Sequence, residues 1–261
     1  MDSNKTNEQN CIISTLCTIS GVKGKCHELC PHWITIHGAT GEGGRLFAAN
    51  IPRQYIHTTL SNSAVEESQP EVYAIIKKYV ESFQKMFDPT LPEKDRIKSL
   101  YLYSNTTGTG KTTTAISIAN EYLKYHYVGS IKRGLKPKRR PVYFMGMNEL
   151  QTLYSEATRP NVPKEIAERA SSRYYENLEA MKDVDFLVFD DIGLRSSTEA
   201  FTSDIHHVIN HRNTTVKPTI YTSNIPLQDI GSMYSKQIWD RTRDMCLEIA
   251  FSGESKRGFR R

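Results

Sequence analysis

The sequence predicts an α/β fold in which a parallel sheet lies between helices, and three observations lead to this prediction. Beyond residue 97, short apolar segments alternate with segments of helical periodicity, which is typical of strand–helix–strand units. A glycine-bearing turn follows the first of these apolar segments and precedes a helix-forming one. The apolar run 186–189 ends in two aspartates, as expected of a buried strand that delivers acids to the ligand-binding edge of a parallel sheet.

The expected elements can be placed in chain order. A helix opens at Pro70, where apolar residues begin to recur at helical spacing, and it ends at Asp88-Pro89. Strands are expected at 100–103, 142–145, 186–189, 219–222 and 246–251. Helices are expected at 112–125, from about residue 148, and at 164–181, 197–210 and 234–243. This alternation places helices on both faces of the sheet.

Length and composition limit the organisation of the 261-residue chain to one large domain and a small appendage. We expect an N-terminal Cys/His module at 1–57, a polar linker at 58–69 and the main α/β domain at 70–261. The contents of 38% apolar and 24% charged residues exclude a wholly disordered or fibrous protein. The start of the chain is polar, and no apolar run approaches the ~20 residues of a bilayer-spanning helix, so we expect a cytoplasmic protein with no membrane partner.

The glycine-bearing turn is a Walker A sequence, Asn-Thr-Thr-Gly-Thr-Gly-Lys-Thr at 105–112, in the strand–turn–helix setting that this motif requires. The glycines allow backbone N–H groups to point at phosphate oxygens beside a helix N-terminus. Lys111 supplies a cation for the β- and γ-phosphates, and the Thr112 hydroxyl is a ligand for Mg²⁺. The residues expected to bind ATP are Asn105, Thr107, Gly108, Thr109, Gly110, Lys111, Thr112 and Thr113.

Asn105 departs from the motif, which has glycine at this first position. Asparagine is among the residues that most readily adopt positive φ, so the sequence predicts that the turn keeps its shape.

The acids that follow 186–189 complete the predicted site. Asp190 is expected to hold the Mg²⁺ shell, and Asp191 is expected to orient or deprotonate the attacking water. With Lys111, these carboxylates predict hydrolysis of a nucleoside triphosphate.

Three segments, 105–112, 186–193 and 219–225, together resemble the DnaC/DnaI helicase-loader branch of the AAA+ ATPases, to which the IstB-type ATP-binding proteins are related. The resemblance covers the chain from about residue 70 onward, and Ile-Pro-Arg-Gln-Tyr at 51–55 is similar to an element that often precedes the ATPase in this family. It implies an AAA+ P-loop ATPase core. We expect no full C-terminal helical lid, since only four residues follow Arg257.

The resemblance also implies roles for residues outside the Walker motifs. Asn224 matches the sensor 1 amide, although an asparagine before Pro226 is also a turn former. Arg241 matches the arginine that acts on a neighbour's ATP; Thr242 replaces the usual hydrophobe after it, and Arg243 is the reserve candidate. Arg257 matches the sensor 2 arginine, and a plain basic tail is the alternative.

The family implies binding to the replicative hexameric helicase, ATP-dependent homo-oligomers and loading of the helicase onto single-stranded DNA. The net charge of +5 and the basic run at 132–140 suit nucleic acid. Tyr125, Tyr127 and Tyr143 are candidates for stacking on bases near that run, and a solvated basic loop is the alternative.

The N-terminal cysteines predict a zinc site, because clustered thiols without an export signal are typical of metal ligands. Cys17, Cys26 and Cys30 are the expected ligands. The fourth is Cys11, His32 or His37; we favour His37, on the far side of a short strand expected at 33–36. Free, partly buried thiols are the alternative. Some DnaI-type loaders carry an N-terminal zinc module that contacts the helicase, which supports this interpretation by resemblance.

Two other functions fit parts of the pattern. An IstB-type helper of a DNA transposase shares the ATPase core, but such helpers usually begin with a helical segment instead of a Cys/His module. An ATP-switched adaptor with little turnover does not need the water-activating Asp191 or Arg241.

Overall fold

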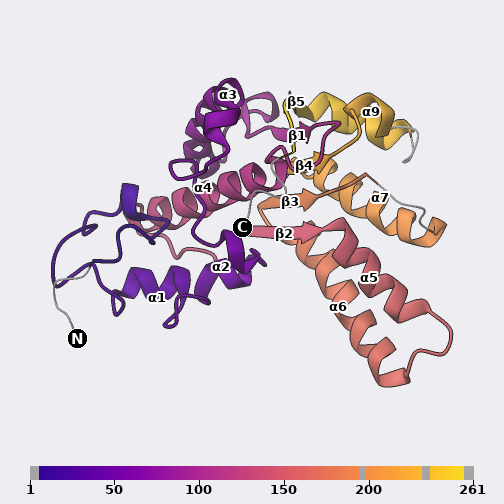
Figure 1. Ribbon diagram of the computed structural model, residues 1–261, viewed down its shortest axis with the longest axis horizontal. Coiled ribbons are helices and arrows are strands. Elements are labelled where there is room, and N and C mark those ends of the chain that lie inside the picture. The colour runs from indigo at the N-terminus through magenta and orange to yellow at the C-terminus, as the bar shows by residue number, and fades with distance from the viewer. Residues whose placement is uncertain (1–5, 194–197, 231–235, 256–261) are drawn as a thin grey trace.

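The computed structural model describes residues 6–193, 198–230 and 236–255, apart from the side chains of 236–239 and Arg241. Its centre is a five-stranded parallel sheet in the order β2-β3-β4-β1-β5 (Figure 1). The strands are β1 (Ser99–Tyr103), β2 (Val142–Gly146), β3 (Phe186–Asp190), β4 (Thr219–Ser223) and β5 (Cys246–Ala250). The α/β prediction and all five predicted strands are therefore confirmed.

Because every strand runs in the same direction, the sheet has two chemically distinct edges. The carboxyl edge carries the loops that leave the strands, and the amino edge carries the segments that enter them. Leu100 pairs with Ile220, and Val188 pairs with the same Ile220 from the other side, so β1, β4 and β3 are aligned at both edges.

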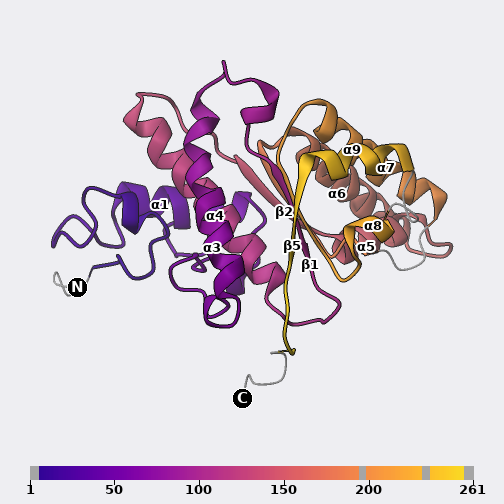
Figure 2. The same ribbon diagram turned by 90° about the horizontal axis from the view of Figure 1, so that it is seen from above.

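Helices cover both faces, as Figure 2 shows with the sheet seen nearly edge-on. One face is covered by α3 (Pro70–Glu81) and α4 (Lys111–Lys132), and the other by α5 (Met147–Thr158), α6 (Lys164–Asp183), α7 (Glu199–Thr214) and α9 (Lys236–Met245). The alternation of strand side chains produces two cores: Phe186 and Val188 join the α4 side, whereas Leu187 and Phe189 join the other. A short helix, α8 (Leu227–Ile230), follows β4.

The helix predicted from Pro70 continues beyond α3 as a 3-10 turn, η4 (Ser82–Phe87), and η5 (Glu93–Asp95) leads into β1. In the N-terminal region the helices are α1 (Pro31–His37) and α2 (Gly44–Ala48), with 3-10 turns η1 (Ser14–Leu16), η2 (Arg53–Tyr55) and η3 (Glu66–Ser68). The strand expected at 33–36 is wrong. Pro31 occupies the first turn of α1, where its fixed φ and missing N–H suit a helix start, and this outweighs the β-branched residues that follow.

The N-terminal residues pack against the main domain. Ile13, Ile36 and Leu46 are buried in the same hydrophobic cluster as Tyr122 and Leu123 of α4. Leu60, within the expected linker, belongs to that cluster as well. The division at residues 57 and 69 stays a prediction, and the segments on both sides of it share one core. In the described ranges, no helix has the length and hydropathy needed to cross a membrane.

Arg212 of α7 fixes the amino edge of the sheet. Its side chain is 0% exposed, and its guanidinium donates to the carbonyl oxygens of Met181 (2.7 Å) and Val184 (2.9 Å) where α6 ends and to that of Pro218 (2.7 Å) before β4. Its Nε donates to the Thr219 hydroxyl at 2.7 Å. Burial lowers the pKa of Arg212 to about 10, so the group is still protonated at neutral pH. The fork geometry of arginine satisfies several buried carbonyls at once, which lysine does not.

Replacing Arg212 by methionine is expected to lower the free energy of unfolding by about 3–5 kcal/mol, because several buried carbonyl oxygens lose their donors together. Urea unfolding followed by circular dichroism measures the change. Arg169→Met, at an exposed position of α6, is the matched control and should stay within about 0.5 kcal/mol of wild type. Equal unfolding midpoints for the two variants would contradict the role assigned to Arg212.

Candidate active site

The Walker A segment forms the turn between β1 and α4 at the carboxyl edge, as predicted. Gly108 (φ 79°) and Gly110 (φ 102°) adopt the left-handed backbone that favours glycine. A Cβ on Gly110 would also lie 2.5 Å from Cγ1 of Val65. Only glycine fits at this position, directly before the first residue of α4.

Asn105 does not adopt the positive φ that the sequence analysis invoked for it. The described non-glycine residues with positive φ are Asn50, Asn161, Asp191 and Val216, so the left-handed geometry proposed for Asn105 is wrong. Its side-chain oxygen instead accepts a hydrogen bond from the Tyr103 hydroxyl. The tight part of the turn lies at the two glycines, and position 105 does not need a glycine.

Lys111 links the turn to the end of β4. Its Nζ donates to Oδ1 of Asn224 at 2.8 Å and to the carbonyl oxygen of Thr106 at 3.2 Å, and the residue is only 8% exposed. Asn224 follows β4 directly, so the structure brings it to the phosphate-binding turn. The turn-forming alternative for Asn224 does not by itself account for this contact.

Asp190 ends β3 and meets the start of α4. Its Oδ1 accepts hydrogen bonds from the hydroxyls of Thr112 (2.8 Å) and Thr222 (2.7 Å). Burial raises the pKa of Asp190, and Asp191 adds to this, whereas the two hydroxyls and the charge of Lys111 oppose it. Thr112 and Asp190 therefore form an oxygen donor set of the kind that Mg²⁺ prefers.

Asp191 has φ 58°, in the left-handed region. Its N–H donates to the Thr222 hydroxyl at 2.9 Å, and its Oδ2 accepts from Nδ2 of Asn148 at 3.3 Å. Such a backbone is uncommon for a residue other than glycine. Strained conformations of this kind are retained where surrounding contacts hold them, often at functional sites.

Thr222 and Asn148 are site residues that the sequence analysis missed. Thr222 is adjacent to Asp190 across the pairing of β3 and β4, and Asn148 follows β2, whose Gly146 pairs with Asp190. Both residues lie at or just after the ends of predicted strands, and this position could have indicated them as site residues. The strand order was needed to use it.

The three other threonines named for ATP binding differ in placement. Thr107 is exposed and Thr113 is half-buried, whereas Thr109 is buried and its hydroxyl lies 3.5 Å from the Thr106 carbonyl oxygen. Their contact with nucleotide stays a prediction.

The structure does not describe the side chains of the two arginines proposed to sense or complete the site. Arg241 is in α9, its side chain is outside the described part of the structure, and Arg257 lies outside the described residues altogether. Because α9 leads directly into β5, its C-terminal end lies at the amino edge, opposite the Walker A turn. Arg243 pairs with Asp240 at 3.5 Å. Thr242 is buried and accepts a hydrogen bond from Asn213 of α7 at 2.8 Å, which explains a hydroxyl where a hydrophobe was expected.

The base-stacking interpretation is wrong for two of the three tyrosines. Tyr127 and Tyr143 are only 5% and 6% exposed. The Tyr127 hydroxyl lies 2.9 Å from Nδ1 of His32, and the Tyr143 hydroxyl donates to Asn177 at 2.7 Å. Tyr125 is half-buried. Contacts with α1 occupy Tyr127 and contacts with α6 occupy Tyr143, so the two rings cannot stack on a strand of nucleic acid.

The four N-terminal cysteines line one small pocket, together with His27 and His32. Burial raises the pKa of Cys11 to about 11, and the nearby Cys17, Cys26 and Cys30 add to the increase. Among the described residues, however, no three His, Cys, Asp or Glu side chains are close enough together to hold a metal ion.

His37 is wrong as the favoured fourth ligand. It is 0% exposed, stacks on Trp33 with 4.1 Å between ring centroids, and its Nε2 accepts the N–H of Ile12 at 3.3 Å. Burial lowers its pKa to about 3. Since 33–36 is helical, Trp33 and His37 lie one turn apart on the same helix face; Trp33 lines the cysteine pocket, whereas His37 does not.

Comparison with known proteins finds solved structures with a similar fold. No protein-family model and no curated protein matches the sequence. The crystal structure of DnaI matches with a TM-score of 0.52 at 22% identity, covering 79% of this chain and 94% of that one. The DnaC helicase loader matches with a TM-score of 0.51 at 18% identity, covering 77% and 100%. The chain has the fold of the DnaC and DnaI helicase loaders.

A Streptococcus pyogenes protein assigned as a primosome component is similar at the same level, with a TM-score of 0.51, 23% identity and coverage of 80% and 93%. The expectation of a fold of the DnaC/DnaI type is thereby confirmed. At these identities the likeness shows the architecture alone.

Proposed function

We propose that this protein is an ATPase that loads the replicative DNA helicase, binding the helicase and single-stranded DNA. The observation that carries the proposal is the convergence of three separate segments at the carboxyl edge. Lys111 contacts Asn224, and Thr112 contacts Asp190. These are the side chains expected to hold the phosphates, the metal ion and the attacking water.

ATP and Mg²⁺ fit the residues present. The Walker A turn offers two left-handed glycines and the start of α4, which carries partial positive charge. Thr112 and Asp190 would hold Mg²⁺, which when bound neutralises charge that develops on the phosphates. Lys111 would exchange its contact with Asn224 for one with phosphate.

Asp191 and Asn224 are assigned to the attacking water. Asp191 is held by Thr222 and Asn148, so its carboxylate has a fixed direction. Once Lys111 turns to phosphate, the Asn224 amide is released to contact the γ-phosphate and the water. The two side chains then position the nucleophile, which is the main chemical task of the protein in phosphoryl transfer.

The helicase and DNA partners are supported by the fold shared with DnaI and the DnaC helicase loader and by the net charge of +5. The solved structures reported above are replication proteins, which favours the loader over the transposase helper.

The test of this function uses Lys111→Ala, with Lys132→Ala at the exposed far end of the same helix as the matched control. Loss of the buried ammonium should reduce ATP turnover about 100-fold or more, whereas the control should keep it. Loading of a purified replicative helicase onto circular single-stranded DNA is then measured with each variant. Wild-type turnover in Lys111→Ala would refute the ATP site, and stimulation of a transposase in place of helicase loading would refute the loader.

Arg241 is proposed to act on the ATP of a neighbouring subunit. The support is the position of α9, whose C-terminal end lies at the sheet edge opposite the subunit's own Walker A turn. A guanidinium supplied across a subunit boundary would make turnover depend on assembly.

Arg241→Ala should leave ATP binding nearly intact and reduce turnover by something like 10³- to 10⁵-fold. Mixing it with Lys111→Ala should restore part of the activity, because some interfaces then combine an intact turn with an intact arginine. ATP hydrolysis is measured with single-stranded DNA present, under conditions where light scattering detects oligomers. A mixture as inactive as its components would place Arg241 within its own subunit.

Zinc binding by Cys17, Cys26 and Cys30 remains part of the proposal, now with Cys11 as fourth ligand. The support is that the four thiols line one pocket, and four thiolates are a common donor set for structural zinc. Coordination requires the thiolates to approach more closely than they do in the described arrangement.

Purified protein should contain about one zinc per chain, as measured by elemental analysis. Cys26→Ser should lose the metal, and Cys246→Ser, at a cysteine in β5 far along the chain, should retain it. Absence of zinc, with all four N-terminal thiols freely titrated by a thiol reagent in the folded protein, would end this hypothesis.

A further inference from the structure

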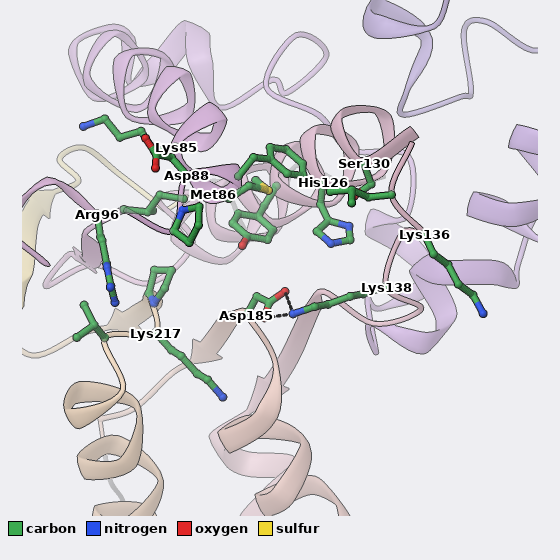
Figure 3. A pocket seen from close by; sticks show the side chains of 17 residues that line it. Lys85, Met86, Asp88, Arg96, His126, Ser130, Lys136, Lys138, Asp185 and Lys217 are labelled. Atoms are coloured by element: carbon green, nitrogen blue, oxygen red, sulfur yellow. Dashed lines mark hydrogen bonds and ion pairs between the residues drawn. The ribbon is translucent and has the colours of Figure 1, made fainter. Parts of the chain in front are cut away.

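The described part of the molecule also has a cavity at the amino edge of the sheet, which the proposed ATPase does not use. This amino-edge pocket encloses about 660 Å³, a volume typical of small-molecule sites. Ile97, Asp185 and Pro218 line it just before β1, β3 and β4. Figure 3 shows the pocket with Asp185 labelled. The proposed ATP site lies at the other ends of the same three strands, roughly 16 Å away for strands of five residues.

The charge of the pocket is strongly positive. Five cationic side chains line it against two carboxylates, leaving an excess of three positive charges: Lys85, Arg96, Lys136, Lys138 and Lys217 against Asp88 and Asp185. Both oxygens of Asp185 bind Lys138, at 2.6 and 2.7 Å (Figure 3). The carboxylate of Asp88 accepts hydrogen bonds from the N–H and hydroxyl of Thr90.

The remaining cations have no carboxylate within ion-pair distance in the part of the chain that the structure describes. Lys85 donates to the carbonyl oxygen of Asp95, and Lys217 donates to those of Lys182 and Asp183. Neutral carbonyls leave the positive charge uncompensated, so the pocket is complementary to an anion.

His126 adds an unsatisfied polar atom. It is only 7% exposed and faces the pocket from α4 (Figure 3), and its Nδ1 has no hydrogen-bond partner among the described residues. Burial lowers its pKa to about 4; Asp185 opposes this, and Lys138 and Arg45 reinforce it. The ring is therefore neutral at pH 7, and a buried neutral nitrogen gains a partner only from a ligand or water.

One wall of the pocket is aromatic and apolar. The ring of Phe87 is stacked with that of His126, with centroids 6.4 Å apart, and Tyr122, Met86 and Leu135 extend the surface. Val216 also lines the pocket, and its backbone is left-handed with φ 53°, which is strained for a β-branched residue. Such strain is retained where a site depends on it, and here it sets the backbone next to Lys217.

We propose that the amino-edge pocket binds a nucleoside monophosphate unit, either free or at the end of a DNA strand. The phosphate lies among the cations that line the pocket, two of which are Lys136 and Arg96. The base lies against the Phe87–His126 wall, where Nδ1 of His126 pairs with a polar atom of the base. The cationic rim is complementary to the phosphate, and the aromatic wall to the face of the base. The buried unpaired nitrogen is complementary to a polar atom of the base.

The test titrates the full chain, with its ATP site saturated by ADP and Mg²⁺, with thymidine monophosphate. Binding is followed by the NMR signals of the His126 ring, assigned with His126→Gln, while the other histidines report on nonspecific effects. The double variant Lys136→Glu/Arg96→Glu is compared with Lys132→Glu/Lys94→Glu, which makes the same charge change at exposed cations nearby that do not line the pocket.

The first pair should raise the dissociation constant about tenfold or more, and the control pair should raise it no more than about twofold. Equal effects of the two pairs, or no shift of the His126 signals at millimolar thymidine monophosphate, would overturn the proposal. Inorganic phosphate that binds as tightly as the nucleotide would overturn the role of the base. A short oligodeoxythymidylate that binds more tightly, with the same response to the variants, identifies a strand end as the source; weaker binding identifies the free nucleotide.

Discussion

The buried guanidinium of Arg212 is the contact on which the geometry of both sheet edges depends. It joins α7 to the end of α6 and to the segments that enter β3 and β4. These strands have only five residues each, so fixing where they begin also fixes where they end. Asp190 and Asn224 are delivered at those ends. The relative placement of the acid and the amide at the carboxyl edge is therefore set by hydrogen bonds at the amino edge.

Within the candidate site, the ligand-binding groups satisfy one another. Lys111 contacts Asn224, and Asp190 accepts hydrogen bonds from Thr112 and Thr222, so buried polar atoms do not remain unpaired. Nucleotide binding must exchange some of these contacts, and only the difference in free energy contributes to affinity. Thr222 keeps its contacts on both aspartates during such an exchange. It is suited to hold the Asp190 carboxylate and the Asp191 backbone against β4 while Lys111 and Thr112 change partners.

The sequence was sufficient for the strands and for the core of the site because both depend on local patterns. Apolar runs of strand length placed β1 to β5, and the Walker A spacing placed Lys111 and Thr112. The predictions that proved wrong concern residues whose conformation or burial is determined by tertiary packing. The β-branched residues at 34–36 form a helix after Pro31, which stacks the buried His37 on Trp33. The burial of Tyr127 and Tyr143 depends on which elements cover them. Thr222 and Asn148 needed the strand order, which no local pattern contains.

Helix α4 connects the two edges of the sheet. Its first residue is Lys111 in the ATP site, and His126 and Ser130 in its last turns line the amino-edge pocket. A helix of 22 residues is about 33 Å long, so the sites share a rigid element but no side chain. Sharing a rigid element does not couple two sites, since coupling needs an element with two arrangements that each ligand favours differently. Lys138 and Asp185 are the place where such a difference can arise: a phosphate that competes for Lys138 frees the carboxylate directly before β3, the strand that carries Asp190.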